Sequence, residues 1–266
     1  MNNLIAILLG SALFFSTASV NALEITYSKI NPFSGDITPT QVENLLLNGE
    51  ILPGDYDALL RVIQNSPERF WRSIGFVLAS PGGDVQESMK IARLVKGTFK
   101  SVFVGPAAGP CVSACFFIFV ASARREAMAK NVGIHRPYTH PGRLHSMSPL
   151  EAEAAQTDAL NQSRLYMENL GVPTNLIDTM FQRASTEVYW LSKSDIEEQL
   201  GRRPPWFEQF LIGRCNLDKS LERKYFESDS TELLDKLLAV DACGVRLSKP
   251  EAHAFLSRQL KLFARR

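Results

Sequence analysis

Three short segments of this 266-residue chain combine residue types that could carry out acyl transfer. A Gly-Gly turn follows an apolar run at residues 80–83, a serine stands among small residues at 109–115, and a histidine ends another apolar run at 133–137. A serine hydroxyl is a weak nucleophile and needs a general base within hydrogen-bond reach. We therefore take Ser113 as the candidate nucleophile and His135 as the candidate base.

Acyl transfer also requires N–H donors that stabilise the negative oxygen of a tetrahedral intermediate. A Gly-Gly turn after a strand can aim backbone amides into a cleft, because glycine has no Cβ to block the approach. A serine at the start of a helix is followed by a residue whose N–H has no partner within the helix. The segments around Gly83 and Ser113 could both supply such donors.

The elements that must position these residues follow from the hydrophobic pattern. Short apolar runs bounded by turn residues are typical of buried parallel strands, and apolar residues at helical spacing indicate helices between them. The pattern predicts strands at 73–79, 101–105 and 132–135, and helices at 85–95 and 113–123. This βαβαβ order favours an α/β fold with helices covering a parallel sheet.

The remainder of the chain reads as mostly helical. Residues 149–182 predict helices that are interrupted at 171–173 by Gly-Val-Pro, with Ser148 as the cap of the first. A short strand at 188–191 and a helix that ends at Leu200 follow. The Arg-Arg-Pro-Pro segment at 202–205 marks a boundary, after which the tail predicts further helices.

The ordered set of motifs resembles the Clp protease/crotonase superfamily, and specifically the Clp-type serine peptidases. The matching residues are Ser80-Pro-Gly-Gly83, Ser113 in a small-residue run, and Ile134-His-Arg-Pro137; residues 184–200 look like the family's next strand and helix. The resemblance covers roughly residues 45–200. It implies repeated ββα (βαβ) units around a parallel sheet core, to which this chain adds a C-terminal helical extension.

The resemblance also implies roles for individual residues. Ser113 would be the nucleophile and His135 the base, and the backbone N–H groups of Gly83 and Ala114 would form the oxyanion hole. The helix around 149–170 would be the family's protruding handle helix, which is often used for assembly. A homo-oligomer that acts on a peptide or protein substrate, with no cofactor, is what the family leads us to expect.

One departure from the family concerns the third member of its catalytic triad. The family's aspartate would fall within 183–187, and position 184 is Ala. Loss of the partner that orients the histidine costs a serine protease about 10⁴-fold in rate. Glu187 and Asp178 are the candidate substitutes, and a Ser–His dyad is the alternative.

The N-terminus predicts export. The apolar run at 4–15 is followed by small residues that end at Ala22, which is typical of a cleaved signal peptide and too short for a comfortable membrane span. We divide the chain into a signal peptide at 1–22, a Clp protease-like α/β domain at 23–200, and a mostly helical extension at 201–266. The mature protein is expected to be soluble and either periplasmic or secreted.

Export places the four cysteines in an oxidising compartment. We expect a disulfide between Cys215 and Cys243, worth roughly 3–4 kcal/mol by the chain-entropy relation. Cys111 and Cys115 flank Ser113; on one helical turn their Cα atoms would be about 6 Å apart, which permits a disulfide but does not require one. Buried free thiols are the alternative for this second pair.

Other classes of partner are disfavoured. The formal net charge of +1 suggests neither nucleic acid nor an anionic membrane. His135, His140 and His145 with the 111/115 cysteine pair suggest zinc, but the C-x₃-C spacing is not the common one for that metal. The chain shows no phosphate-cradling glycine-rich loop. We therefore expect no metal and no nucleotide.

Three functional hypotheses follow. The first is an exported Clp-like serine hydrolase, most simply a peptidase, which a cytosolic unfoldase could not reach. The second is a catalytically inactive protein that keeps the fold for binding or assembly, and Ala184 motivates it. The third retains the oxyanion hole for an acyl-thioester reaction, as crotonase relatives do, although coenzyme A esters are largely intracellular.

Overall fold

A computed structural model describes residues 22–37, 43–139, 141–228 and 230–266. The predicted signal peptide lies outside these ranges, apart from Ala22. Within them, no helix is both long enough and apolar enough to cross a membrane.

The larger of two sheets has five strands in the order β1-β2-β3-β4-β6. Its outermost pair, β1 with β2, is antiparallel, and the other neighbours are parallel. The strands are β1 (Glu24–Ser28), β2 (Asn44–Asn48), β3 (Gly75–Ala79), β4 (Ser101–Val104) and β6 (Arg124–Ala127). All five residues of β3 are buried, as its continuous apolar sequence predicts for a central parallel strand.

A second, three-stranded sheet carries the strands that lead into the candidate site. It consists of β5 (Cys111–Val112), β7 (Val132–Ile134) and β8 (Tyr189–Trp190), with β5 parallel to β7 and β8 antiparallel to it. The strand predicted at 132–135 is therefore present as β7, but it does not belong to the same sheet as β3 and β4, as the βαβαβ pattern predicted. The place beside β4 belongs to β6, whose Arg-Arg-Glu-Ala sequence lacks the apolar signal of a buried strand.

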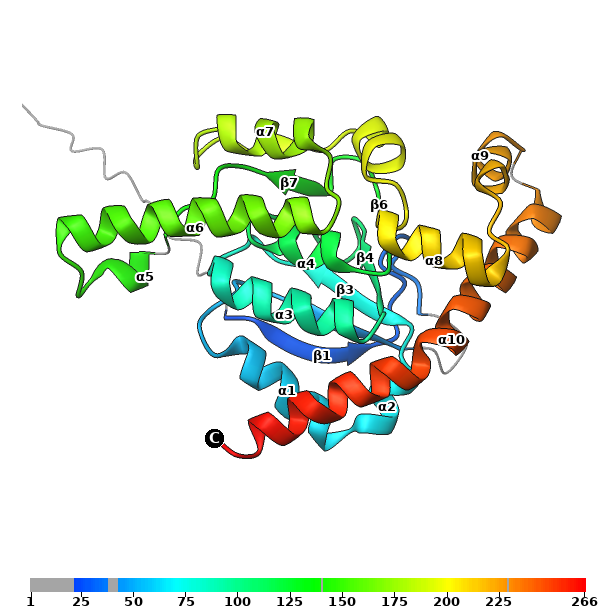
Figure 1. Cartoon of the computed structure of the whole chain (residues 1–266), viewed down its shortest axis with the longest axis horizontal. Coiled ribbons are helices and arrows are strands. Elements are labelled where there is room, and N and C mark those ends of the chain that lie inside the picture. Colours follow the sequence, from blue (N-terminus) through cyan, green and yellow to red (C-terminus); the bar gives the residue numbers. More distant parts are fainter. Residues whose placement is uncertain (1–21, 38–42, 140, 229) are drawn as a thin grey trace, which may run out of the picture.

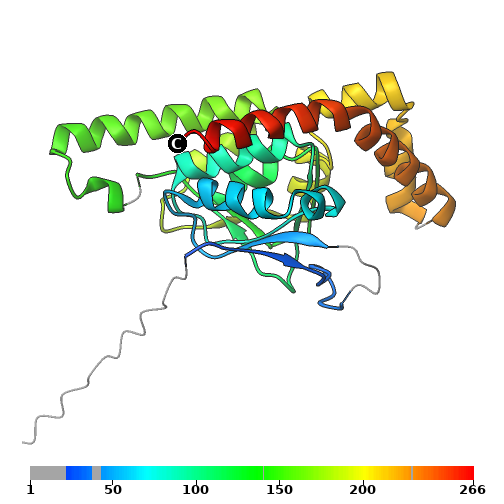
Figure 2. The same cartoon turned by 90° about the horizontal axis from the view of Figure 1, so that it is seen from below.

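Helices cover one face of the larger sheet in two layers. The inner helices are α1 (Asp55–Asn65), α2 (Pro67–Arg72), α3 (Val85–Gly97) and α4 (Cys115–Ala121). Figure 2 shows α1 and α3 above the sheet, with α6 (Pro149–Asn169) and α10 (Thr231–Phe263) farther out. Every residue of α4 is buried, so this short helix forms part of the core.

The helix that the family resemblance identifies as a handle is α6, and it extends well beyond the sheet (Figure 1). Its start matches the prediction, since Ser148 and Glu151 form a capping box before the Pro149 turn. Only Ser163 and Met167 of α6 are buried. Gly171 then adopts a positive φ of 75° and separates α6 from α7 (Thr174–Gln182).

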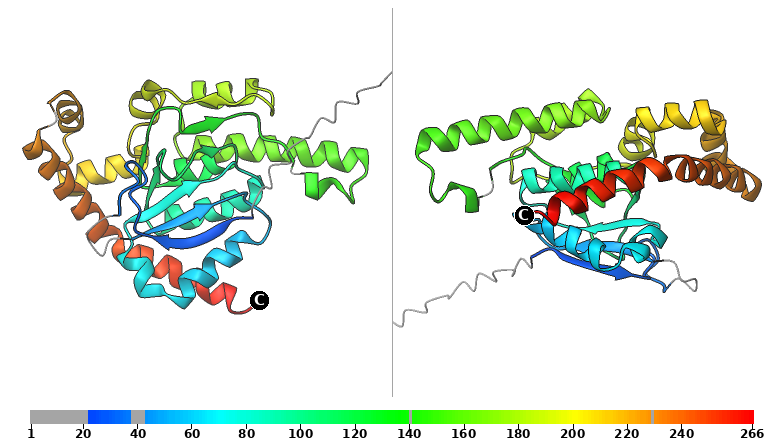
Figure 3. Two further views of the ribbon diagram at one scale, coloured as in Figure 1. Left: turned by 180° about the vertical axis from the view of Figure 1, so that it is seen from behind. Right: turned by 60° about the horizontal axis from the view of Figure 1, so that its bottom comes forward.

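The C-terminal helices return to the α/β core. After the short π-helix η1 (Asp195–Leu200), the chain forms α8 (Pro205–Cys215) and α9 (Lys219–Ser228), and then the 33-residue α10. Figure 1 shows α10 running from α9 back toward α1 and α2, and the view from behind in Figure 3 brings the strands of the larger sheet to the front. In this way the tail packs on α1 and α3.

Specific contacts hold this tail in place. A disulfide joins Cys215 of α8 to Cys243 of α10, with 5.8 Å between the Cα atoms. Near the other end of α10, His253 stacks on Trp71 at 3.9 Å between ring centroids. Arg203, whose side chain is almost fully buried, pairs with carboxylates of α9 and α10.

Candidate active site

Ser113 lies in a tight turn between β5 and α4, with a φ of +58°. The predicted helix at 113–123 instead begins at Cys115. The Ser113 N–H donates to the Gly133 carbonyl at 2.9 Å, which extends the pairing of β5 with β7 as far as the serine. A non-glycine residue in the left-handed region costs of order 1–3 kcal/mol and persists only where its surroundings impose it. Ser113 therefore stands at a turn that the fold holds in an unfavourable conformation.

A disulfide between Cys111 and Cys115 closes this turn. The two residues do not share a helical turn: Cys111 belongs to β5, whereas Cys115 is the first residue of α4. Their Cα atoms lie 5.4 Å apart, and neither residue has any exposed surface. The covalent link thus joins the strand before Ser113 to the helix after it.

The Gly-Gly turn packs directly against the serine. Gly82 and Gly83 have φ values of +101° and +136°, which side-chain-bearing residues rarely adopt. A Cβ added to Gly82 would lie 2.7 Å from the Ser113 Cβ, and one added to Gly83 would lie 2.1 Å from the Ile51 carbonyl oxygen. Both the conformation and the lack of space require glycine at these two positions.

Hydrogen bonds fasten the glycine loop on both sides. The Ser80 Oγ accepts from the Gly82 N–H at 3.1 Å. The Ile51 N–H donates to the Gly82 carbonyl and the Ile51 carbonyl accepts from the Asp84 N–H, each at 2.7 Å. The loop is therefore held in one arrangement before any ligand arrives.

The N–H groups of Gly83 and Ala114 differ from these hydrogen-bonded amides. Neither donates to an acceptor in the part of the chain that the structure describes, although the neighbouring amides of Gly82, Asp84 and Ser113 all do. The Ala114 N–H also lies close to the glycine loop, 2.9 Å from where a Cβ of Gly82 would be. Two free donors on either side of Ser113 are what an oxyanion hole requires.

His135 follows directly after β7 and is 6% exposed. Since β5 and β7 are parallel neighbours, Ser113 and His135 leave the same edge of the smaller sheet. The His135 Nδ1 lies 3.1 Å from the Arg136 carbonyl oxygen. A proton on Nδ1 can donate to this carbonyl, which leaves Nε2 free to accept a proton. Within the described residues, His135 and Ser113 do not hydrogen-bond to each other.

The two candidate substitutes for the catalytic acid lie elsewhere. Asp178 pairs with Arg164 of α6 at 3.0 Å and its side chain is 46% exposed. Glu187 is exposed to solvent. In the described ranges, no carboxylate contacts His135.

The segment in which the resemblance expected the acid pairs with Arg136, the residue after the histidine. The Arg136 N–H donates to the Arg183 carbonyl at 3.4 Å, and the Arg136 Nε donates to the Phe181 carbonyl at 2.7 Å. Ala184 follows at once and carries no functional group. The structure therefore gives the imidazole a backbone carbonyl as its polar partner, where the resemblance led us to expect a carboxylate.

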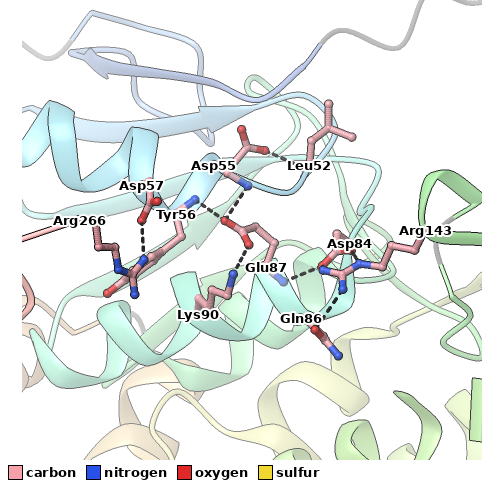
Figure 4. A network of polar contacts seen from close by, with 11 residues as sticks. Leu52, Asp55, Tyr56, Asp57, Asp84, Gln86, Glu87, Lys90, Arg143 and Arg266 are labelled. Atoms are coloured by element: carbon pink, nitrogen blue, oxygen red, sulfur yellow. Dashed lines mark hydrogen bonds and ion pairs between the residues drawn. The ribbon is translucent and has the colours of Figure 1, made fainter. Parts of the chain in front are cut away.

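An ion pair between Asp84 and Arg143 lies beside the glycine loop, and the sequence did not predict it. Asp84, which is 2% exposed, caps α3 by accepting from the Glu87 N–H and forms a two-pronged pair with Arg143 of the short helix α5 (Pro141–Leu144) (Figure 4). Asp84 directly precedes the helix predicted at 85–95, and nothing in the sequence connects it to an arginine 59 residues away. The pair holds α5 next to Gly83.

A second buried carboxylate braces the same region. Glu87 is 1% exposed and accepts from the N–H groups of Gly54 and Tyr56 at 3.1 and 2.8 Å, while the Lys90 Nζ donates to it at 2.7 Å (Figure 4). These bonds fix the chain just after Ile51, the residue that pairs with the glycine loop. The start of α3 is thus tied to two separate parts of the protein.

A cavity of about 120 Å³ opens beside this ion pair, between the start of α3, the segment after His135, and α5 and α6. Its lining includes Gln86, Tyr138, Met147 and Ala155 as well as both partners of the ion pair. Larger hollows of about 430 and 370 Å³ lie against the C-terminal helices, away from Ser113. The small cavity is lined by Asp84, which follows Gly83, and by Tyr138, whose ring centroid lies 6.0 Å from that of His135.

Metal ligands do not assemble in the described residues, where no group of three or more His, Cys, Asp or Glu side chains could hold an ion. Of the three histidines considered for zinc, His140 lies outside the described residues. The four cysteines are all in disulfides.

Comparison with known proteins finds no matching family model and no matching curated sequence. Solved structures do match. A mutant of the 1510-N membrane-bound stomatin-specific protease is 16% identical over 59% of this chain and 75% of its own, with a TM-score of 0.41. ClpP1 from Listeria monocytogenes is 20% identical over 59% of this chain and 86% of its own, with a TM-score of 0.38.

Enoyl-CoA hydratase from Bacillus anthracis is also similar, at 11% identity over 90% of this chain and 96% of its own, with a TM-score of 0.39. At such identities and TM-scores, function has to be argued from the site itself. The chain has a mixed α/β fold with a parallel sheet core and C-terminal helices, and its structural neighbours are ClpP-type proteases and enoyl-CoA hydratases.

Proposed function

We propose that this protein is a serine hydrolase that cleaves peptide bonds, with Ser113 as its nucleophile. The observation that carries the proposal is the pair of free N–H groups, from Gly83 and Ala114, on either side of a serine held at positive φ. A turn that served only to connect β5 to α4 would not need Ser113 in an unfavourable conformation, and it would not account for the free N–H of Gly83, which lies outside the helices. Preorganised donors of this kind are often the largest single contribution to acyl-transfer catalysis.

In the proposed reaction, the Ser113 Oγ attacks the carbonyl carbon of the scissile bond while the His135 Nε2 takes its proton. The carbonyl oxygen becomes negative and accepts hydrogen bonds from Gly83 and Ala114. As the intermediate collapses, His135 returns the proton to the departing amine. Water then attacks the acyl-enzyme with His135 again as the base, and Ser113 is regenerated.

The Arg136 carbonyl takes the orienting role in this scheme. It accepts from Nδ1 and so selects the tautomer in which Nε2 is the base. Being neutral, it stabilises the imidazolium less than a carboxylate would. We therefore expect a slower enzyme than one with a complete triad.

The cavity beside Asp84 is where we place one side chain of the substrate. Its volume of about 120 Å³ suits a small or medium side chain, and it begins one residue after the proposed oxyanion donor Gly83. Two disulfides are compatible with export and with a periplasmic or secreted location. The exposed length of α6 supports assembly into a homo-oligomer.

A binding or assembly protein without catalysis is the second candidate. The observation in its favour is the missing carboxylate, because Ala184 occupies the segment beside Arg136 and no acid among the described residues replaces it. Under this hypothesis the fold would be retained for its surfaces. Replacing Ser113 by Ala would then leave any cellular phenotype of the protein unchanged.

Active-site labelling tests the proposal. The mature chain is treated with a serine-directed fluorophosphonate, and the modified residue is identified by mass spectrometry. We expect labelling at Ser113 that is lost in Ser113→Ala. Ser122→Ala is the matched control, since Ser122 is fully buried and bonded to the Phe119 carbonyl, and it should label normally.

A folded wild-type protein that is not labelled would contradict the proposal and favour the binding protein. For the labelled protein, fluorogenic peptides and acyl-coenzyme A thioesters then distinguish the substrate classes. We expect turnover of peptides that Ser113→Ala abolishes. Turnover of thioesters alone would point to a crotonase-like activity.

A further inference from the structure

The turn that carries Ser113 is closed by a covalent link, and this suggests what the activity depends on. The loop between the two disulfide-bonded cysteines holds only Val112, Ser113 and Ala114. Two of these three residues are the proposed nucleophile and a proposed oxyanion donor. Any change in the distance between Cys111 and Cys115 must therefore move one or both of them.

Different hydrogen bonds hold the two ends of this turn. On the strand side, Cys111 and Val112 donate to the Asn131 and Ser80 carbonyls, each at 2.9 Å. On the helix side, the Phe116 N–H donates back to the Ser113 carbonyl at 2.9 Å, so this bond lies within the turn itself. The Ser88 hydroxyl donates to the Ala114 carbonyl from α3.

We propose that the Cys111–Cys115 disulfide is a positioning device for the active site, and that the reduced chain is a poor catalyst. This inference rests on the proposed function of Ser113. The disulfide ties the start of α4 to a firmly paired strand and thereby holds the left-handed conformation of Ser113 and the direction of the Ala114 N–H. Cys111 and Cys115 touch no substrate; they act through the residues between them.

Because both cysteines are buried, the disulfide has to form during folding. Neither cysteine has exposed surface, so reductants and oxidants cannot reach the sulfurs in the folded protein. The bond must form while the chain folds, by exchange with a disulfide-bearing donor. Two thiols lose two electrons and two protons, one S–S bond forms, and the donor's disulfide is reduced to two thiols. A chain that folded in a reducing compartment would lack the bond and stay weakly active, since its buried thiols could not be oxidised afterwards.

The experiment isolates this disulfide by removing the other one. In a Cys215→Ser/Cys243→Ser background, the only remaining cysteines are the pair at Ser113. The protein is refolded with reductant or with oxidised glutathione, its free thiols are counted, and its fold is checked by circular dichroism. The readouts are the rate constant and the half-saturating concentration for fluorophosphonate labelling of Ser113.

We expect the reduced form to fold but to label about 10- to 100-fold more slowly, because small misplacements of catalytic groups have effects of this size. The loss should appear in the maximal rate constant and not in probe binding. Unfolding the reduced form in denaturant and refolding it with oxidised glutathione should restore the rate, because the thiols are then exposed while the bond forms. The background variant itself, when oxidised, should label like wild type.

A second variant guards against a reduced form that does not fold. Cys111→Ala/Cys115→Ala removes the bond and both thiols, and we expect the same loss of rate. Equal labelling rates in a folded reduced form and in the oxidised form would overturn the inference while leaving Ser113 as the nucleophile. Loss of the fold in both preparations would also overturn it, since the bond would then support the whole domain. Absence of labelling in oxidised wild type would instead refute the proposed function.

Discussion

The two sides of the candidate active site are built very differently. On one side, the loop at Gly82 and Gly83 is held by Ser80 and Ile51, and the start of α3 behind it is tied down by two buried carboxylates. On the other side, the His135 side chain has one polar contact within the described ranges, from Nδ1 to the carbonyl of the next residue.

The contrast indicates which part of the chemistry this fold supports best. Stabilisation of an oxyanion depends on donors that do not move, and the glycine loop provides them. Proton transfer depends on the orientation and basicity of the imidazole, which a neutral carbonyl supports less than a carboxylate does. We infer that the rate of this protein is limited on the histidine side, and the following predictions test that inference.

The largest effect is expected at the base itself. His135→Ala should lower the rate of Ser113 labelling by about 10²–10⁴-fold, because general base catalysis contributes this much. The rate constant for fluorophosphonate labelling, measured side by side for the two proteins, checks this. An unchanged rate would mean that His135 takes no part in activating Ser113.

The glycine loop should be nearly as sensitive. Gly83→Ala adds a Cβ 2.1 Å from the Ile51 carbonyl oxygen at a φ of +136°, so the loop must shift and the proposed donor moves with it. We expect a loss of about 10²–10³-fold in peptide hydrolysis.

Gly54→Ala is the matched control for this loop. Gly54 also has a positive φ, of +103°, but a Cβ there meets no atom within 4 Å. Gly54→Ala therefore places alanine at an unfavourable positive φ, as Gly83→Ala does, but it does not push the surrounding backbone aside. Equal losses of activity in the two variants would show that general instability, and not the donor, explains the effect.

An acid placed beside the histidine should raise the activity. Ala184→Asp introduces a carboxylate in the segment that pairs with Arg136, and we expect roughly a tenfold gain in kcat with little change in KM. Asp178→Asn removes a carboxylate that pairs with Arg164 and should leave kcat within twofold. No gain in Ala184→Asp would indicate that the backbone carbonyl already orients His135 well.

The smallest effect is expected at the ion pair between Arg143 and Asp84, next to the glycine loop. Arg143→Gln breaks the ion pair with Asp84 and leaves that buried carboxylate with its cap to α3. We expect a several-fold rise in KM for peptides whose side chain enters the adjoining cavity, and a smaller change in kcat. If kcat fell as far as in Gly83→Ala, the ion pair would have to position the donor directly.

Much of the local structure was predictable from the sequence. The strands at β3 and β4, the helix at α3, and the capped start of α6 follow from apolar periodicity and cap residues, which act over a few neighbours. The order of the three motifs made Ser113, His135 and the glycine turn the candidate site, and their roles remain predictions. The disulfide between Cys215 and Cys243, which we expected, is also present.

Only the tertiary structure decided how these pieces meet. It divided the strands between two sheets, placed charged β6 where an apolar strand was expected, and joined Asp84 to Arg143. It put Ser113 before the helix at positive φ and showed that His135 contacts a carbonyl. These outcomes depend on contacts between segments that are distant along the chain, and neither spacing nor periodicity records which segments will pack together.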